Sequence, residues 1–177
     1  MRWRAKTTLI AVTIVLDQLS KIWALHSVRG HLPRSYLGGI FRLEYAENPG
    51  AFLSLGSSLD AEVRFWIFTI AVAGFLAGTV VYLFKKAKEL DASTSLYLCF
   101  IAAGGFGNLI DRVRNPNHAV IDFLNVGMGS LRTGIFNVAD MAIMGGVIGM
   151  LIQAIWTTKS QKSPGTSEGS AERLPNS

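Results

Sequence analysis

Four long apolar stretches dominate the pattern of hydrophobic and polar positions along the chain. A helix needs roughly 20 mostly apolar residues to cross a bilayer, and each of the four stretches meets that requirement approximately. Residues 160–177, in contrast, are rich in Ser, Gly, Pro and Glu, a composition typical of a disordered segment. The pattern therefore predicts one four-helix membrane domain over residues 1–159, followed by a tail. The predicted spans cover residues 7–25, 63–84, 93–110 and 136–156.

The two long connections between these spans, residues 26–62 and 111–135, contain shorter patterns. Apolar and polar residues alternate over residues 41–45, and this period of two is typical of a half-buried strand. Residues 51–55 and 131–133 are candidates for further short strands. Because open strand edges cannot lie in hydrocarbon, these segments predict a small sheet at the membrane surface.

The basic residues indicate how the spans are oriented. Only 16% of the chain is charged, against about 25% in a typical soluble domain. The net charge is +5, but no continuous basic face is present, which argues against nucleic-acid binding. The positive-inside rule places both termini in the cytoplasm and the sheet outside. The basic residues that set this orientation are Arg2, Arg4, Lys6, Lys85, Lys86, Lys88, Lys159 and Lys162.

The expected fold is therefore an all-α membrane protein with four transmembrane helices and a small extracytoplasmic β-sheet at the outer interface. Charged and amide residues gather at the outer ends of three of its helices. Charged residues in membrane helices are costly and usually functional. With this orientation they lie at one depth, just inside the outer interface. They are Asp17 and Lys21 in the first span, Asn108, Asp111 and Arg112 at the end of the third, and Asn137 and Asp140 at the start of the fourth.

Two acids are the hardest to explain by structure alone. Asp140 is expected inside the fourth helix, where no basic residue of that helix lies near it. Asp122 interrupts the apolar run of residues 119–124. Asp122 belongs to the second outer connection, which can fold over the polar helix ends. Structural roles stay open for the other positions: an ion pair for Asp17 and Lys21, a membrane boundary for Asp111 and Arg112, and a helix N-cap for Asn137.

Other catalytic patterns are absent from the sequence. The three histidines lack metal-ligand spacing, and neither H-E-x-x-H nor G-x-S-x-G occurs. Cys99 is the only cysteine, has no histidine near it in sequence, and is expected to pack inside the third helix. The glycines of residues 104–107 favour close approach of helices. We therefore expect neither a metal nor a cofactor.

Two other classes of function are less consistent with these residues. A proton-coupled transporter would need ionisable groups across both leaflets, but the inner halves of the spans contain almost none. No inverted repeat is apparent either. A non-enzymatic membrane scaffold would leave Asp122 and Asp140 unexplained.

Five motifs follow one another over about residues 15–145. They are Asp17-Gln18-x-x-Lys21, ENPGAF at 47–52, GGFGNLIDR at 104–112, VIDF at 120–123 and FNVAD at 136–140. In this order they resemble the motifs of the lipoprotein signal peptidase (signal peptidase II) family. One departure is Pro49 followed by the direct Ala51-Phe52 pair, which bears only on fine substrate contacts.

The resemblance implies four transmembrane helices, a small extracytoplasmic sheet and an aspartic endopeptidase with Asp122 and Asp140 as its catalytic pair. Its substrate would be a prolipoprotein, cleaved before the diacylglyceryl-modified cysteine at the outer face of the bacterial cytoplasmic (inner) membrane. We expect a multi-pass monomer in contact with membrane lipid. Supporting or substrate-binding roles would fall to Asn48, Gly50, Asn108, Asp111, Arg112, Asn137, Asp17 and Lys21.

Two close carboxylates suggest a mechanism. They cannot both ionise easily, so they would share one proton. The ionised acid could activate water, while the protonated acid polarises the scissile carbonyl and then protonates the leaving amine. The sequence does not distinguish these two roles. Arg112 could stabilise Asp111 or a transition-state oxygen, and Asn108 and Asn137 could orient the carboxylates.

Overall fold

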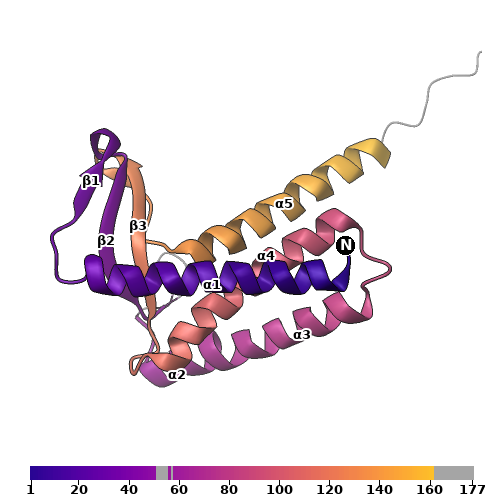
Figure 1. The fold of residues 1–177 in the computed structure, drawn as a ribbon, viewed down its shortest axis with the longest axis horizontal. Coiled ribbons are helices and arrows are strands. Elements are labelled where there is room, and N and C mark those ends of the chain that lie inside the picture. Colours follow the sequence, from indigo (N-terminus) through magenta and orange to yellow (C-terminus); the bar gives the residue numbers. More distant parts are fainter. Residues whose placement is uncertain (51–55, 57, 162–177) are drawn as a thin grey trace, which may run out of the picture.

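The computed structural model describes residues 1–50, 56 and 58–161, and it shows long helices with a small sheet at one end (Figure 1). The candidate strand at 51–55 and residues 162–177 of the expected tail lie outside the described residues. The helix α5 continues to Gln161, two residues into that tail. The helical elements are α1 (Trp3–Ser27), α2 (Ala61–Phe65), η3 (Trp66–Ala71), α3 (Val72–Lys85), α4 (Ala92–Arg114) and α5 (Val138–Gln161).

All four predicted membrane spans are present as helices. Since α2, the π-helical segment η3 and α3 follow one another without a break, they form one span. Within the part of the chain that the structure describes, four helices are long and apolar enough to cross a bilayer. The first three extend beyond the predicted bounds at both ends, whereas the fourth begins two residues later than predicted, at Val138, and ends two residues later, at Thr158. These spans are Trp3–Ser27, Ala61–Lys85, Ala92–Arg114 and Val138–Thr158.

The sheet is antiparallel with the strand order β1-β2-β3-β4, and a short 3-10 turn, η1 (Leu37–Gly39), links β1 to β2. The predicted strand at 41–45 is confirmed as part of β2, and two residues of the predicted strand at 131–133 form β4. The sequence pattern did not predict β3, because residues on both of its faces are buried and alternation is lost. The strands are β1 (Arg34–Tyr36), β2 (Phe41–Asn48), β3 (Val120–Met128) and β4 (Leu131–Arg132).

The glycines of α4 bring three helices into close contact, as predicted. A Cβ atom added at Gly104 would lie 2.3 Å from the carbonyl oxygen of Ala139 in α5. One added at Gly107 would lie 2.5 Å from the Asp17 carboxylate in α1. Small residues at such positions allow backbones to pack closely where helices cross a membrane. This packing sets the distance between the polar ends of α1, α4 and α5.

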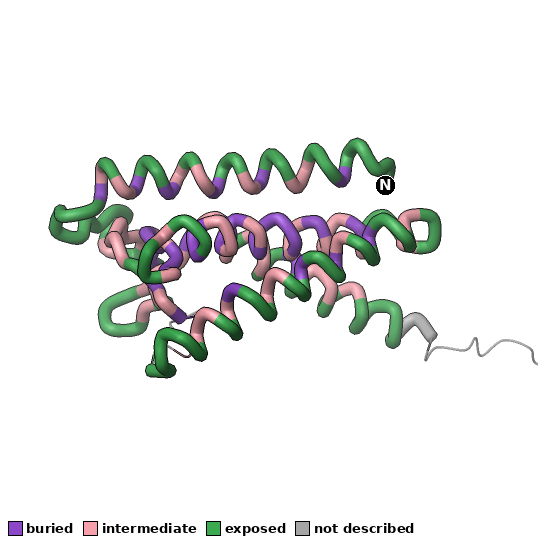
Figure 2. Tube along the Cα trace, turned by 90° about the horizontal axis from the view of Figure 1, so that it is seen from below, coloured by how far each residue is buried: buried purple, intermediate pink, exposed green. Residues whose placement is uncertain are grey.

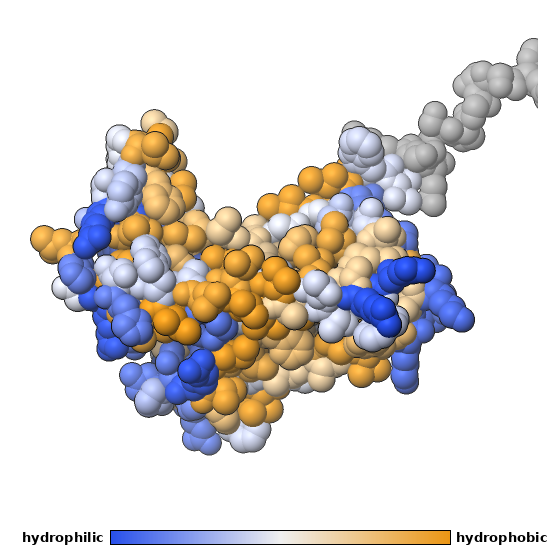
Figure 3. Space-filling model, viewed as in Figure 1, coloured by the Kyte–Doolittle hydropathy of each residue, from blue (hydrophilic) through white to orange (hydrophobic). Residues whose placement is uncertain are grey.

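Buried positions concentrate on α4, whereas the outward faces of the other helices are exposed (Figure 2). Many of the exposed side chains are large and apolar, including Leu16, Phe75 and Leu151. Figure 3 shows this apolar surface extending along the helices. Contiguous apolar surface of this extent indicates contact with lipid rather than water. Cys99 is fully buried in α4, as predicted.

Candidate active site

Lys21 lies at the centre of a buried ion cluster at the sheet end of the helices. Its Nζ atom is 2.9 Å from a carboxylate oxygen of Asp17 and 2.9 Å from one of Asp111. It also donates a 2.9 Å hydrogen bond to Asn108 Oδ1, so all three ammonium hydrogens have an acceptor. The predicted Asp17–Lys21 ion pair is therefore confirmed. The partner of Asp111 is Lys21, and no ion pair joins Asp111 to Arg112 among the described residues.

This ion cluster fastens four elements together. The backbone N–H of Ala139 in α5 donates to Asp17 at 2.9 Å, and that of Ile121 in β3 donates to Asp111 at 3.0 Å. Gln18 donates to Asp111 at 3.1 Å and to Asp17 at 3.2 Å. Gln18 is a site residue that was not predicted, although its place between Asp17 and Lys21 in the motif was a usable signal.

Asp122 is positioned by the pairing of β2 with β3. It lies opposite Ala46, which places Asn48 diagonally across from it on the same face of the sheet. Asn48 donates to Asp122 Oδ2 at 3.0 Å. Asn137 donates to the other oxygen, Oδ1, at 2.6 Å. The carboxylate is only 1% exposed, so its surroundings are almost free of bulk water.

Asp140 is positioned by the first turn of α5. Asn137 precedes the helix and accepts a 2.9 Å hydrogen bond from the N–H of Asp140, while Asp140 Oδ2 accepts one of 3.2 Å from the N–H of Asn137. This reciprocal pair is a capping box, so the N-cap role considered for Asn137 is confirmed. Asn108 donates to Asp140 Oδ1 at 2.9 Å. Through Asn137, the carboxylates of Asp122 and Asp140 share one hydrogen-bonding partner.

Neither Asp122 nor Asp140 is paired with a cation among the described residues. No ion pair reaches Asp122 or Asp140 from residues 1–50, 56 and 58–161. Burial, followed by the nearby Asp140 carboxylate, raises the pKa of Asp122 from 3.8 to about 7. The hydrogen bonds from Asn48 and Asn137 lower that pKa but do not outweigh burial. Asp122 therefore holds a proton near neutral pH far more often than an ordinary aspartate does.

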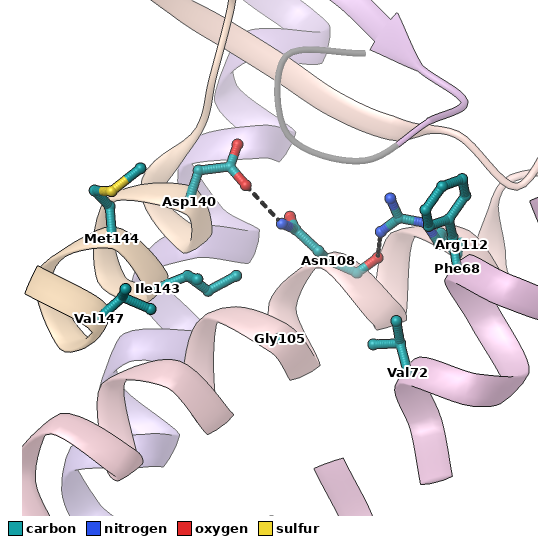
Figure 4. Close-up of a pocket in the computed structure, with 9 residues that line it drawn as sticks. All are labelled: Phe68, Val72, Gly105, Asn108, Arg112, Asp140, Ile143, Met144 and Val147. Atoms are coloured by element: carbon teal, nitrogen blue, oxygen red, sulfur yellow. Dashed lines mark hydrogen bonds between the residues drawn. The ribbon is translucent and has the colours of Figure 1, made fainter. Parts of the chain in front are cut away.

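A cavity of about 320 Å³ opens beside Asp140, between α3, α4 and α5 (Figure 4). One edge of this cavity is polar and its walls are apolar. A site of this kind suits a ligand that is largely hydrocarbon and carries a few polar groups at one end. The polar edge is formed by Asn108, Arg112 and Asp140, and the walls by Phe68, Val72, Gly105, Ile143, Met144 and Val147.

Arg112 joins this cavity to the segment after β2. Its Nη2 atom donates to the carbonyl oxygen of Gly50 at 2.6 Å, and Nη1 donates to that of Asn108 at 3.3 Å. The Gly50 N–H in turn donates to Asn48 Oδ1 at 3.0 Å. Since Asn48 also donates to Asp122, a continuous series of hydrogen bonds connects Arg112 to Asp122. The structure thus brings all the predicted site residues together, from α1, α4, β3, the end of β2 with the residues after it, and the start of α5 with Asn137 before it.

Comparisons with known proteins agree with this arrangement. The family model described as signal peptidase (SPase) II matches residues 9–156. The lipoprotein signal peptidase of Xanthomonas axonopodis pv. citri is 30% identical over 158 residues, covering 89% of this chain and 90% of that protein. The lipoprotein signal peptidase of Psychromonas ingrahamii is 32% identical, covering 91% of this chain and 88% of that protein.

The fold agrees as well. A solved structure described as a bacterial membrane enzyme superimposes with a TM-score of 0.77 at 22% sequence identity, covering 93% of this chain and 96% of the other. A second structure with the same description has a TM-score of 0.71, at 21% identity. The family match covers most of the chain, including the four membrane helices and both buried acids. The chain therefore belongs to the signal peptidase II family and is a multi-pass membrane peptidase.

Proposed function

We propose that Asp122 and Asp140 are the catalytic pair with which this peptidase removes signal peptides from prolipoproteins. The observation that carries the proposal is their shared contact with Asn137, at 2.6 Å to Asp122 and 3.2 Å to Asp140. A pair of carboxylates without a cation partner holds one proton between them, as hydrolysis by an aspartic mechanism needs.

The proton belongs initially to Asp122, whose pKa of about 7 favours the neutral acid. Asp140 lines the cavity and acts as the base. As the oxygen of a water molecule bonds to the scissile carbonyl carbon, Asp140 takes a proton from that water. Asp122 then donates its proton to the amide nitrogen as the carbon–nitrogen bond breaks. The products are a carboxylic acid and a free amine, and one proton remains on the pair.

Asparagines and an arginine hold the reacting groups in place. Asn48 and Asn137 orient Asp122, while Asn108 orients Asp140. The Nε atom of Arg112 is buried and has no hydrogen-bond partner among the described residues. An unpaired buried donor is costly, so it is available to bind a carbonyl oxygen of the substrate.

The apolar walls of the cavity support a lipid-modified substrate. We propose that the peptide is cut before a diacylglyceryl-modified cysteine, with hydrocarbon lying against residues such as Val72, Ile143 and Val147. Each methylene buried on leaving water contributes about 0.8 kcal/mol as an upper guide. The net gain is smaller because this lipid starts in the bilayer.

The site is proposed to face the outside of the cytoplasmic membrane. The N-terminus and the loop between α3 and α4 lie at the end of the helices opposite the sheet (Figure 1). That end carries Arg2, Arg4, Lys85, Lys86 and Lys88. By the positive-inside rule it lies in the cytoplasm, which places the sheet and the acid pair at the outer face.

Purified Asp122→Asn and Asp140→Asn variants test the pair. Each should cleave a diacylglyceryl-modified prolipoprotein at least about 1,000-fold more slowly than wild type, because each removes one proton-transfer group. Thermal unfolding in detergent should show both variants folded. Asp60→Asn, which changes an exposed acid on the same side, should keep full activity. Normal cleavage by either pair variant would overturn the assignment.

The unlipidated form of the same prolipoprotein tests the substrate separately. Wild-type enzyme should cleave it much more slowly than the lipidated form. Equal rates would remove the lipid requirement while leaving the catalytic pair untouched.

A further inference from the structure

The end of the sheet that points away from the helices exposes several large apolar side chains. We call this region, residues 34–41 and 126–132, the free end of the sheet. Leu37 is 77% exposed in the first hairpin, and Met128 and Leu131 are 73% and 83% exposed in the second. Figure 3 shows the same apolar surface over this part of the sheet. Such a patch on a small hairpin pair is costly in water and indicates a binding surface.

The two hairpins are joined, so the patch is already formed in the folded protein. Arg132 Nη1 donates to the carbonyl oxygen of Gly39 at 2.8 Å. The N–H of Gly127 donates to the carbonyl oxygen of Ile40 at 2.9 Å. These bonds hold η1 against the β3–β4 hairpin. The exposed residues of both hairpins therefore present one surface rather than two independent loops.

Leu37 provides an independent indication of function. Its backbone has a φ of +52°, the left-handed region in which leucine is strained and glycine or asparagine is preferred. Its side chain is nevertheless large, apolar and 77% exposed. Neither local conformation nor packing accounts for a leucine here. Strained residues of this kind cluster at functional sites.

The position and charge of the free end indicate what covers it. The strands run across the ends of the spanning helices, so the free end extends sideways beyond the bundle at the level where the helices leave the bilayer (Figure 1). The free end contains Arg34 and Arg132 and no acid. Arginine pairs well with phosphate, and this combination of apolar and basic residues fits a phospholipid surface.

We propose that the free end of the sheet is a membrane anchor that inserts Leu37, Met128 and Leu131 among the headgroups of the adjacent phospholipid leaflet. The anchor holds the sheet, and with it Asp122 on β3, at a fixed height over the bilayer. It stands independently of the catalytic assignment, since insertion can be measured on an inactive enzyme.

Depth-dependent fluorescence quenching tests the anchor. A cysteine-reactive environment-sensitive probe is placed at Leu37→Cys or Leu131→Cys in a Cys99→Ala background, and the protein is reconstituted in phospholipid vesicles. Lipids brominated near the headgroup should quench both probes several-fold more than a probe at Asn117→Cys. Asn117 is exposed in the connection between α4 and β3, outside the free end. Equal quenching at all three positions would overturn the proposal.

The variant Leu37→Asn separates insertion from folding. Asparagine tolerates a positive φ, so its melting temperature in detergent should equal or exceed that of wild type. In vesicles, quenching of the probe at position 131 should fall at least twofold. Unchanged quenching in this folded variant would contradict the anchor. Weak quenching of both probes in the Cys99→Ala parent would also overturn the membrane anchor. Since the vesicles contain no other protein, that result would indicate that the free end binds a protein instead of lipid.

Discussion

Two groups of buried polar residues meet at the sheet end of the helices and differ in how their charges are compensated. In the ion cluster, Lys21 lies between the carboxylates of Asp17 and Asp111, 2.9 Å from each. In the acid pair that we propose to be catalytic, amide groups alone hold Asp122 and Asp140. Asn108 touches both groups, because it accepts from Lys21 and donates to Asp140.

The difference shows how neighbouring acids acquire different roles. The ammonium group of Lys21 compensates the charge of the acids beside it, so these acids can hold elements together, whereas burial and a neighbouring acid raise the pKa of Asp122. The ion cluster therefore sets the geometry, and the acid pair is proposed to carry the reactivity. Four substitutions examine this division, from the largest expected effect on stability to the smallest.

Lys21→Met should cause the largest loss, about 3–5 kcal/mol of unfolding free energy, because it leaves two buried carboxylates without a cation. Reversible unfolding in a denaturing detergent would measure this loss. The triple variant Asp17→Asn/Lys21→Met/Asp111→Asn should recover more than half of it, since no charge is then left unpaired. A triple variant as unstable as the single one would show that shape, rather than charge, dominates the cluster.

Gly107→Ala should cost about 1–3 kcal/mol, because the new methyl group would lie 2.5 Å from the Asp17 carboxylate and push α1 away from α4. The same unfolding measurement applies. Gly74→Ala in α3 is the matched control. Its methyl group would meet nothing within 4 Å, so that variant should be as stable as wild type or slightly more so. Equal stability of the two variants would contradict the close packing at Gly107.

Asp122→Asn should change the pH dependence of stability. Because the folded pKa of Asp122 is about 7 and its ordinary value is 3.8, folded protein binds the extra proton between these values. The contribution of Asp122 to the free energy of unfolding therefore falls as the pH rises from 3.8 to about 7, by at most about 1.4 kcal/mol per pH unit. Asparagine has no such titration. The melting temperature of the variant should thus gain on that of wild type from pH 5 to pH 8, and parallel melting curves would exclude the raised pKa.

Cys99→Ala should have the smallest effect, about 1 kcal/mol or less in stability and less than twofold in cleavage rate. Cys99 is fully buried within α4 and serves only as a small packing residue. A standard cleavage assay on the detergent-purified variant would measure this. An inactive but folded variant would point to a thiol mechanism instead of the acid pair.

Much of the architecture was predictable from the sequence because it depends on local composition. Whether a segment of about 20 residues enters a bilayer is determined by its own side chains, so all four spans were found. The depth of Asp17, Lys21 and Asp140 followed from helical rise alone. The alternation in residues 41–45 likewise predicted part of β2.

The tertiary structure decided which of these groups meet. Strand β3 was not predicted, since burial on both faces removes alternation, and only its pairing with β2 brings Asn48 to Asp122. Lys21 has carboxylate partners on two helices, a choice that no spacing along one helix can specify. Asn137 caps its own helix and also reaches β3, because the packing of α5 against α4 and the sheet places its side chain between two acids. Hydropathy is a property of each segment, whereas charge compensation depends on residues that are distant in sequence, and only the folded chain brings them together.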